Sequence, residues 1–363
     1  MAEALRVTTL RTQGFRNLAE LELQPGPRFN VLHGDNGQGK SNVLEALDYL
    51  AVLRSFRGAL PADMIARHAE HAELAAVVQV EPIAHRCKVR LHRREAREVT
   101  LDGKRPRSRT GYLGALQSVL FHPGDLQLVA GSPELRRAWL DRILERFDAT
   151  YASSLLAYER ALRSRNRLLR ADRPDRRAIK AYDEVLSAAG AVVGKARERL
   201  CDELGPLVIE AFATISGEQH ELGIRFQPRV APELTALRAA LENSLDKDLA
   251  RGFTAEGPHA DDLAFSFDGV LVKRFGSQGQ HRAVVLALKV AELEELTRRV
   301  GRVPILLLDD VSSELDKDRS RRLFALLAAL GGQVFLTTTA PELILLDRER
   351  KDFRVRSGVV AED

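Results

Sequence analysis

Residues 28–49 read RFNVLHGDNGQGKSNVLEALDY, and this stretch indicates the class of fold. An apolar run ends at Gly34, the pattern G-x-x-x-x-G-K-S follows through Ser41, and apolar residues then recur at helical spacing from Val43 to Leu50. Glycines let such a loop wrap its backbone N–H groups around a phosphate, and the N-terminus of the following helix also favours an anion. The stretch therefore predicts a strand, a phosphate-binding loop and a helix.

The residue types in this loop also predict how it binds a nucleotide. Lys40 supplies a positive charge to the phosphates, and the hydroxyl of Ser41 is placed to ligate Mg²⁺. The predicted nucleotide-binding residues of the loop are Gly34, Asp35, Asn36, Gly37, Gln38, Gly39, Lys40 and Ser41.

Composition allows a large core and excludes several classes of protein. The chain has 363 residues, of which 45% are hydrophobic and 29% charged, enough for two domains or for one domain with an insertion. No apolar run approaches the roughly 20 residues that span a bilayer, and the N-terminus lacks the apolar core of a secretion signal. Cys87 and Cys201 lack metal-ligand spacing and are predicted to be packing residues. A cytoplasmic protein without a membrane segment is expected.

Alternating polar and apolar residues predict antiparallel strands on both sides of the phosphate loop. Residues 5–26 alternate around a turn at 13–17 and predict a hairpin, with Arg16 near its bend. Residues 74–102 alternate in the same way and predict two or three strands with one solvated, basic face. The segment from Pro133 to Gly217 is rich in Ala, Leu, Arg and Glu. It predicts an inserted helical domain, with helices of about 30 residues at most.

After Gly217 the strand signals return, and the chain is expected to re-enter the first domain. Buried apolar strands that alternate with helices indicate a parallel sheet. The predicted domains are 1–132, 133–217 and 218–363. The predicted elements are strands at 222–226, 263–267, 270–275, 303–311 and 333–338, with a helix at 317–330.

Two segments, 85–109 and 160–180, are rich in arginine and lysine. A solvated surface explains such clusters, and so does a track for a nucleic-acid backbone, because clustered cations release counterions when they neutralise phosphates. Both readings stay open from the sequence. The candidate DNA-binding residues are Arg93, Arg94, Arg105, Arg107, Arg163, Arg165 and Arg167.

A second acidic motif completes the predicted nucleotide site. The apolar run 305–308 ends in Asp309 and Asp310. An acid at the tip of a strand beside a phosphate loop holds Mg²⁺ through its water shell, and the next acid can polarise the attacking water. Asp309 is therefore the predicted metal ligand and Asp310 the predicted general base, with Lys40 as the third catalytic residue.

Two further stretches resemble ATP-binding-cassette ATPases. The sequence SQGQ opens a long amphipathic helix and is similar to the signature of that family, and SSELD, directly after the aspartates, is similar to its D-loop. In that family the signature helix caps the γ-phosphate held by the partner subunit. The residues carried over are Ser277, Gln278, Gly279 and Gln280 for the signature and Ser313, Glu314 and Asp316 for the D-loop.

Over residues 10–340 the chain resembles the RecF family of bacterial recombinational-repair proteins. The resemblance implies an ABC-type ATPase head, with a parallel sheet, an antiparallel β-subdomain and an inserted α-helical lobe. It also implies a homodimer that forms on ATP binding, a weak DNA-dependent ATPase, and work with RecR and RecO to place RecA where duplex adjoins a single-strand gap. Arg16 would approach the phosphates. The motifs are PGDL (123–126), GSPELRRAWLD (131–141), GPHADDL (257–263), SQGQ (277–280) and LLLDDVSSELD (306–316).

Some positions depart from the wider pattern. Threonines at 337–339 stand where many cassette ATPases carry a switch histidine, and Ala260 stands where RecF relatives commonly have arginine. Gln117 is a candidate Q-loop residue, although packing explains it better. His259 and Trp139 are predicted to be structural.

Three alternatives remain from the sequence alone. The motor subunit of a membrane transporter predicts a switch histidine and an apolar docking groove, and a small-molecule kinase predicts no SQGQ or SSELD stretch. A RecF-like scaffold with incidental DNA contact predicts a weak salt dependence of DNA binding.

Overall fold

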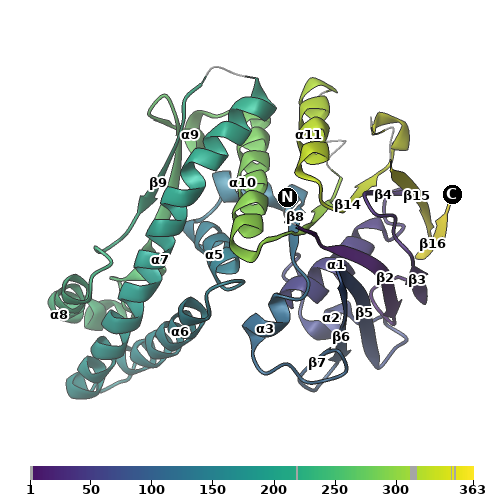
Figure 1. Cartoon of the computed structure of the whole chain (residues 1–363). Coiled ribbons are helices and arrows are strands. Elements are labelled where there is room, and N and C mark those ends of the chain that lie inside the picture. Colours follow the sequence, from purple (N-terminus) through teal and green to yellow (C-terminus); the bar gives the residue numbers. More distant parts are fainter. Residues whose placement is uncertain (1–2, 218–219, 311–316, 345, 347–348) are drawn as a thin grey trace. The chain divides into compact units, whose positions relative to one another are not determined.

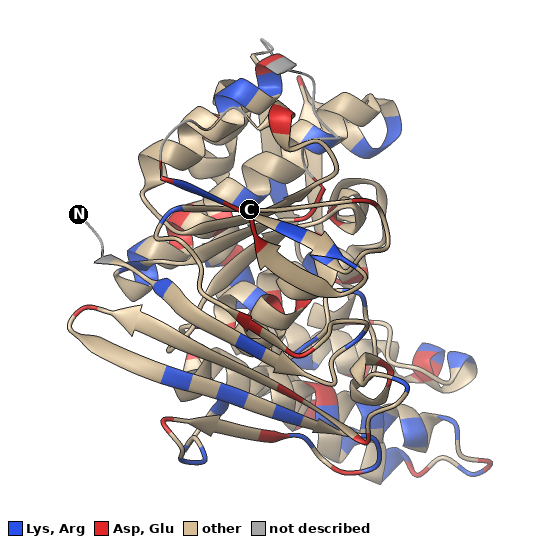
Figure 2. Cartoon of the chain, turned by 90° about the vertical axis from the view of Figure 1, so that its right-hand side faces the viewer, with Lys and Arg blue, Asp and Glu red and all other residues tan. Residues whose placement is uncertain are grey.

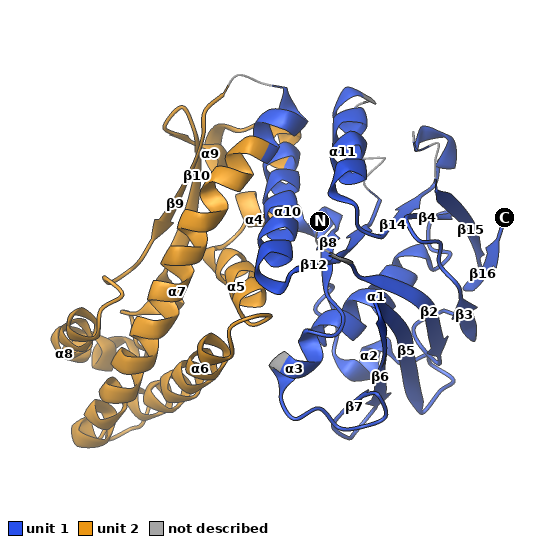
Figure 3. Cartoon of the chain, in the orientation of Figure 1, with its two compact units in different colours: residues 1–125, 211–217, 282–363 blue, residues 126–210, 218–281 orange. Residues whose placement is uncertain are grey.

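The computed structural model describes residues 3–217, 220–310, 317–344, 346 and 349–363, and the chain divides into two compact units (Figure 3). Unit 1 comprises residues 1–125, 211–217 and 282–363, and unit 2 comprises residues 126–210 and 218–281. None of the described helices combines the length and apolar composition needed to cross a membrane.

A six-stranded sheet forms the centre of unit 1 (Figure 1). Its order is β16-β15-β4-β14-β13-β8, and all neighbours are parallel except β15 and β16. Every residue of β8, β13 and β14 is buried, as expected for parallel strands covered on both faces. The strands are β4 (Phe29–His33), β8 (Ser118–Phe121), β13 (Ile305–Leu308), β14 (Val334–Thr338), β15 (Arg350–Arg356) and β16 (Val359–Glu362).

A second, antiparallel sheet in unit 1 has the order β3-β2-β5-β6-β7. It confirms the predicted hairpin and the predicted strands within 74–102. Helix α1 (Lys40–Val52) packs against both sheets, and one apolar cluster joins the three layers. The strands are β2 (Arg6–Gln13), β3 (Leu21–Leu23), β5 (His71–Val80), β6 (Ile83–His92) and β7 (Glu98–Leu101).

Shorter elements complete unit 1. Strand β1 (Glu3–Ala4) pairs in parallel with β12 (Arg302–Val303). The helices are α2 (Pro61–Met64), α3 (Arg109–Leu113), the 3₁₀ turns η1 (Pro123–Leu126) and η4 (Pro341–Leu343), α11 (Lys317–Leu330), and the greater part of α10 (Gln278–Val300).

Unit 2 is mainly helical and includes a three-stranded antiparallel sheet, β11-β10-β9. The sheet belongs to this unit because β10 packs on α5 and because Arg136 binds Asp262 with two hydrogen bonds of 2.7 and 3.1 Å. The elements are α4 (Gln127–Ala130), α5 (Pro133–Leu144), α6 (Ala149–Leu169), the greater part of α7 (Arg176–Ser216), β9 (Leu222–Gln227), α8 (Leu234–Arg251), η2 (Pro258–Ala260), β10 (Asp262–Phe267), β11 (Val270–Leu271) and α9 (Val272–Phe275).

Three expectations about this region were wrong. The chain returns to the first unit at Arg282 and not directly after Gly217, because 220–281 joins unit 2. Helix α7 runs for 41 residues through Pro206, beyond the expected limit of 30, since buried residues such as Leu204 and Val208 continue its apolar face across the proline. The predicted strand 270–275 is a two-residue strand followed by the turn of α9.

Candidate nucleotide-binding site

The phosphate loop connects the end of β4 to the start of α1, as predicted. Its glycines at 34, 37 and 39 have φ values of 140°, 76° and 115°, which residues with a Cβ rarely adopt. Gly39 is the N-cap of α1 and brings no capping side chain, so a bound anion can take that place at the helix N-terminus.

Lys40 folds back over this loop. Its Nζ donates hydrogen bonds to the carbonyl oxygens of Gly34 at 2.6 Å and Asp35 at 2.9 Å. Burial lowers the pKa of Lys40, while the nearby carboxylates of Asp310, Asp309 and Asp35 act to raise it. The side chain thus holds its charge between the loop and the two aspartates.

The aspartate pair lies at the carboxyl edge of the same sheet, one strand away from the loop strand. Strand β14 lies between β4 and β13, and its Thr337 links them: the Thr337 hydroxyl donates to Asp309 Oδ1 at 2.8 Å, and the backbone N–H of Asp310 donates to Thr337 Oγ1 at 2.9 Å. Asp310 has a φ of 54°. Thr337, which the sequence left without a role, therefore orients the predicted metal ligand.

These side chains fit a magnesium ion. The Ser41 hydroxyl and the Asp309 carboxylate are hard oxygen ligands, and Mg²⁺ in nucleotide sites takes one or two such groups beside phosphate oxygens and water. Among the described residues there is no cluster of three His, Cys, Asp or Glu side chains that would hold a metal without a nucleotide.

The turn between β15 and β16 packs on the phosphate loop, which the sequence did not predict. Gln38 receives hydrogen bonds from the backbone N–H groups of Ser357 at 2.6 Å and Gly358 at 2.8 Å. On another side Asn17 donates to the carbonyl of Gly37 at 3.3 Å. A Ser-Gly turn between alternating residues is a hairpin signal, but nothing in the sequence places that turn against residues more than 300 positions away.

Gly34 lies tightly against strand β15, just before this turn. A Cβ at residue 34 would stand 2.3 Å from the carbonyl oxygen of Val355, and the φ of 140° is also unfavourable for alanine. We expect Gly34→Ala to lower the free energy of unfolding by about 1–3 kcal/mol and to weaken nucleotide binding about tenfold by displacing one loop donor. Thermal unfolding and a nucleotide titration measure the two effects.

Gly37→Ala is the matched control, because a Cβ at residue 37 meets nothing within 4 Å although its φ is also positive. Equal losses in the two variants would show that backbone conformation, and not the contact with Val355, sets the cost at residue 34.

Arg16 lies beside α1, but its guanidinium is bound by Glu45. Arg16 Nε and Nη2 donate to the two Glu45 oxygens at 2.9 and 2.8 Å, and Ser55 Oγ donates to the same buried carboxylate at 2.6 Å. This ion pair links the bend of the β2–β3 hairpin to α1, the helix that follows the phosphate loop. A contact of Arg16 with the nucleotide stays a prediction.

The SQGQ stretch begins α10 with a reciprocal cap. Ser277 Oγ accepts from the backbone N–H of Gln280 at 3.2 Å, and Gln280 Oε1 accepts from the backbone N–H of Ser277 at 2.9 Å. Ser277 and Gln278 are exposed. The predicted D-loop residues Ser313, Glu314 and Asp316 lie outside the described residues.

The predicted DNA-binding arginines fall into three groups. Arg94, Arg105 and Arg107 in unit 1 and Arg163 and Arg167 on α6 are exposed. Arg93 is also exposed, yet it donates to three backbone carbonyls. Figure 2 shows further Lys and Arg positions as blue bands along the antiparallel sheet, where Lys88 and Arg90 pair with Glu73.

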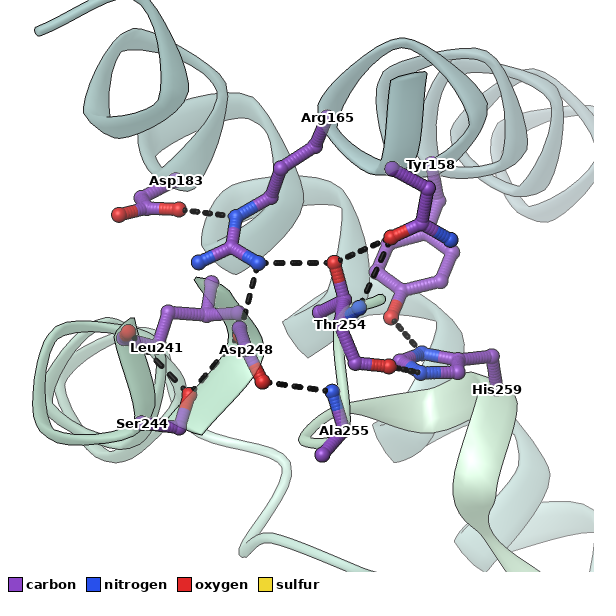
Figure 4. Close-up of polar contacts among 10 residues, drawn as sticks. Tyr158, Arg165, Asp183, Leu241, Ser244, Asp248, Thr254, Ala255 and His259 are labelled. Carbon is purple, nitrogen blue, oxygen red and sulfur yellow. Dashed lines mark hydrogen bonds and ion pairs between the residues drawn. The ribbon is translucent and has the colours of Figure 1, made fainter. Parts of the chain in front are cut away.

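Arg165 corrects the prediction. Its side chain is 0% exposed and binds Asp183, Asp248 and Thr254, each at 2.8 Å (Figure 4). It lies on the inner face of α6, two residues from the exposed Arg163, and cannot contact DNA while unit 2 is folded. Counting the basic residues of a segment does not show which of them lie on the exposed face of a helix and which lie on its buried face.

Among the other residues predicted to be structural, Trp139 and the two cysteines are buried and His259 is partly buried. Trp139 is in the core, and burial raises the pKa of both Cys87 and Cys201 to about 12. His259 contacts the Tyr158 hydroxyl at 2.6 Å and the Thr254 carbonyl at 2.9 Å, and burial lowers its pKa. Gln117 is buried just before β8, at the edge of the sheet opposite the phosphate loop, which excludes the Q-loop assignment.

A glycine-rich loop lies between a parallel strand and a helix, and two aspartates follow the strand two places along the sheet. This arrangement defines the fold of a P-loop ATPase. The antiparallel sheet and the helical unit narrow the class to ABC-type ATPase heads. A family model described as RecF/RecN/SMC N terminal domain matches residues 6–356. The chain belongs to the RecF family of DNA replication and repair proteins. This membership excludes the transporter motor and the small-molecule kinase.

Two relatives illustrate the family match. The chain is 41% identical to the DNA replication and repair protein RecF of Anaeromyxobacter sp. (strain Fw109-5), over 98% of this chain and 99% of the relative. It is 35% identical to the protein of the same description from Citrifermentans bemidjiense, over 98% of this chain and 100% of the relative.

Solved structures agree with the fold. A structure described as the recombination mediator protein RecF-ATPrS in the RecFOR pathway matches with a TM-score of 0.90 at 29% identity, over 99% of both chains. The Smc head domain from Pyrococcus furiosus matches with a TM-score of 0.58 at 16% identity, over 99% of this chain and 96% of that one, and shares the fold.

Proposed function

We propose that this protein is an ATP-gated DNA-binding protein of recombinational repair. Two copies close around two ATP molecules with Mg²⁺, and the closed dimer binds duplex DNA beside a single-strand gap. There it acts with RecR and RecO to place RecA. The names of its relatives, DNA replication and repair protein RecF and recombination mediator protein in the RecFOR pathway, support this assignment.

The placement of Lys40, Asp309 and Asp310 around the phosphate loop carries the nucleotide part of the proposal. Lys40 neutralises the phosphates, Ser41 and Asp309 hold Mg²⁺, and Thr337 fixes the Asp309 carboxylate. Asp310 polarises the attacking water. Its side chain is shorter than a glutamate, so we propose slow hydrolysis that resets the dimer and not a fast motor cycle.

The exposed start of α10 supports nucleotide sharing between two copies. The N-terminal N–H groups of a helix and a serine hydroxyl suit the γ-phosphate that the partner copy holds. ATP then acts as a switch because its γ-phosphate makes contacts only in the closed state. The DNA contacts are proposed for Arg94, Arg105, Arg107, Arg163 and Arg167, with Arg165 removed.

Light scattering with and without ATP and Mg²⁺ tests the proposal directly. We expect the wild-type protein to become a dimer only with ATP, and Ser277→Arg to stay a monomer because the larger cation fills the place of the partner's γ-phosphate. Under the same conditions duplex binding should need ATP and should weaken steeply as salt rises.

Ser153→Arg is a suitable control, since Ser153 is exposed on α6 of the same unit and its hydroxyl donates locally to the Thr150 carbonyl at 2.9 Å. It should dimerise like the wild type. A monomer under all conditions, with ATP hydrolysis unchanged by Ser277→Arg, would contradict the shared site. Salt-insensitive DNA binding would favour the scaffold alternative.

A further inference from the structure

An exposed aromatic residue comes directly before the SQGQ stretch in unit 2. Phe275 ends α9, two residues before Ser277, and is 67% exposed. Of the aromatic residues in the described part of the chain, only Phe275 and Phe253 are exposed, and Phe253 is exposed to 44%. A single exposed apolar side chain needs no explanation by itself, so the role of Phe275 has to follow from what surrounds it.

The backbone that carries Phe275 is held by hydrogen bonds. The carbonyl oxygen of Val272 accepts from the backbone N–H of Gly276 at 2.8 Å and from Nε2 of His281, in the first turn of α10, at 2.9 Å. Val272 is 1% exposed, and a Cβ at Gly276 would stand 2.8 Å from the same carbonyl oxygen. The turn of α9 is therefore fixed to the start of α10, and it presents the ring of Phe275 to solvent in one place. A group held in advance loses little entropy when it binds.

The surroundings of the ring are cationic. The guanidinium carbon of Arg274 lies over the ring, 5.3 Å from its centroid, and Arg274 forms no ion pair in the described part of the chain. Lys273 is also exposed and donates to the carbonyl of Gly131 at 2.8 Å. The sequence contains no Asp or Glu from residue 269 to residue 291. An aromatic ring beside cations suits a base that is linked to phosphates better than it suits an apolar protein surface.

The distance along the chain also fits a nucleotide. The Cα atoms of Phe275 and Ser277 are at most about 7 Å apart, because each residue spans no more than about 3.6 Å. The start of α10 and the Ser277 hydroxyl suit a γ-phosphate. The ribose and base of the same nucleotide then lie within reach of a large side chain just outside the helix.

We propose that Phe275 stacks on the base of the ATP molecule that the partner copy holds. Ser277 receives the γ-phosphate, Arg274 supplies positive charge beside the ring, and Phe275 contacts the base. This inference rests on the proposed shared ATP site and adds recognition of the base to it. Each copy then tests the whole nucleotide of its partner and not only the terminal phosphate.

The dissociation constant of the dimer at saturating ATP and Mg²⁺ tests the proposal with the full chain. Each stack of a base on an aromatic side chain contributes about fivefold or more, and a dimer loses two of them, so Phe275→Ala should raise this constant by about 25-fold or more. ATP affinity should stay within about twofold at protein concentrations where the wild type is a monomer, since Phe275 does not contact the chain's own nucleotide.

Phe253→Ala is the matched control. Phe253 is the same residue type, is also exposed, and belongs to the same unit, directly after the C-cap of α8. This variant should form the dimer like the wild type.

A change of base distinguishes stacking on the nucleotide from contact with the partner's protein surface. Adenine has the larger ring system, so the wild-type dimer should be weaker at saturating UTP than at saturating ATP. Phe275→Leu keeps an apolar side chain and removes the ring, so the difference between the two nucleotides should shrink in this variant. Phe275→Trp should restore it.

Three outcomes would overturn the proposal. A dimer of Phe275→Ala as stable as the wild type would do so and would leave ATP-dependent dimerisation, and with it the proposed function, standing. Equal weakening of the ATP and UTP dimers in Phe275→Leu would mean that the ring packs on protein, together with the half-exposed Val270 and Leu271 of β11. A wild-type protein that stays a monomer with ATP would contradict the proposed function and this inference together.

Discussion

Lys40→Ala is expected to weaken ATP binding by about 10- to 100-fold, because one charge-assisted hydrogen bond contributes about 1.5–3 kcal/mol. Hydrolysis should fall further, by about 100- to 1,000-fold, since the lysine charge is aimed at the phosphates whose charge develops in the transition state. An ATP titration followed by single-turnover hydrolysis separates the two effects.

The structure suggests that this loss is one of chemistry and not of folding. Among the described residues, Lys40 Nζ donates only to the carbonyls of Gly34 and Asp35, which water can reach once the side chain is removed. The unfolding midpoint without nucleotide should therefore change little, whereas the increase in stability that ATP gives the wild type should be largely lost.

Lys104→Ala removes an exposed lysine of the same unit and serves as the control. It should bind and hydrolyse ATP like the wild type. ATP affinity within twofold of the wild type in Lys40→Ala would mean that the loop binds phosphate through its backbone alone and that the assigned role of Lys40 is wrong.

The predictable parts of this site are those whose residues are neighbours in the sequence or follow from one rule of sheet topology. The loop from Gly34 to Ser41 carries its own geometry, because the glycines, the lysine and the following helix are neighbours in the chain. Asp309 and Asp310 could be placed beside it because parallel strands end at one edge of a sheet. Both predictions needed only local pattern and one rule of topology.

The parts that were missed depend on pairing between distant segments. Residues 350–362 form a strand pair that joins the sheet beside β4 and brings Ser357 and Gly358 onto Gln38. The sequence of a short alternating stretch does not show which strand of a sheet it pairs with. Helix α7 is likewise longer than the predicted limit of about 30 residues, because its apolar face continues past Pro206.

The Arg165 cluster shows the same limit for a charged residue. Burial of an arginine requires acids from other elements, and these come from Asp183 on α7 and Asp248 on α8, the latter in a helix that the sequence did not predict. Ser244 Oγ and the backbone N–H of Ala255 also bind Asp248, at 3.2 and 3.1 Å. The spacing of these residues in the sequence does not show that their side chains lie close together.

Arg165→Ala is expected to lower the free energy of unfolding by about 3–5 kcal/mol, because it leaves two buried carboxylates without their cation. Burial already raises the pKa of Asp183, and Arg165 is what opposes that rise, so the variant should also take up a proton at Asp183 at higher pH than the wild type. Denaturant unfolding measures the first effect and its pH dependence the second.

Arg163→Ala on the same helix is the matched control, since Arg163 is 64% exposed and, in the described part of the chain, pairs only with Glu159, at 3.6 Å. Its stability should change by no more than about 0.5 kcal/mol, while DNA affinity and its salt dependence should fall if α6 faces DNA. The two variants thus separate two effects that a DNA-binding assay alone would confuse. Loss of DNA binding in Arg165→Ala reports unfolding of unit 2, and loss in a fully folded Arg163→Ala reports a phosphate contact. Equal stability of the two variants would mean that water or relaxation of α8 satisfies Asp248, and that the buried ion pairs of Arg165 add no net stability.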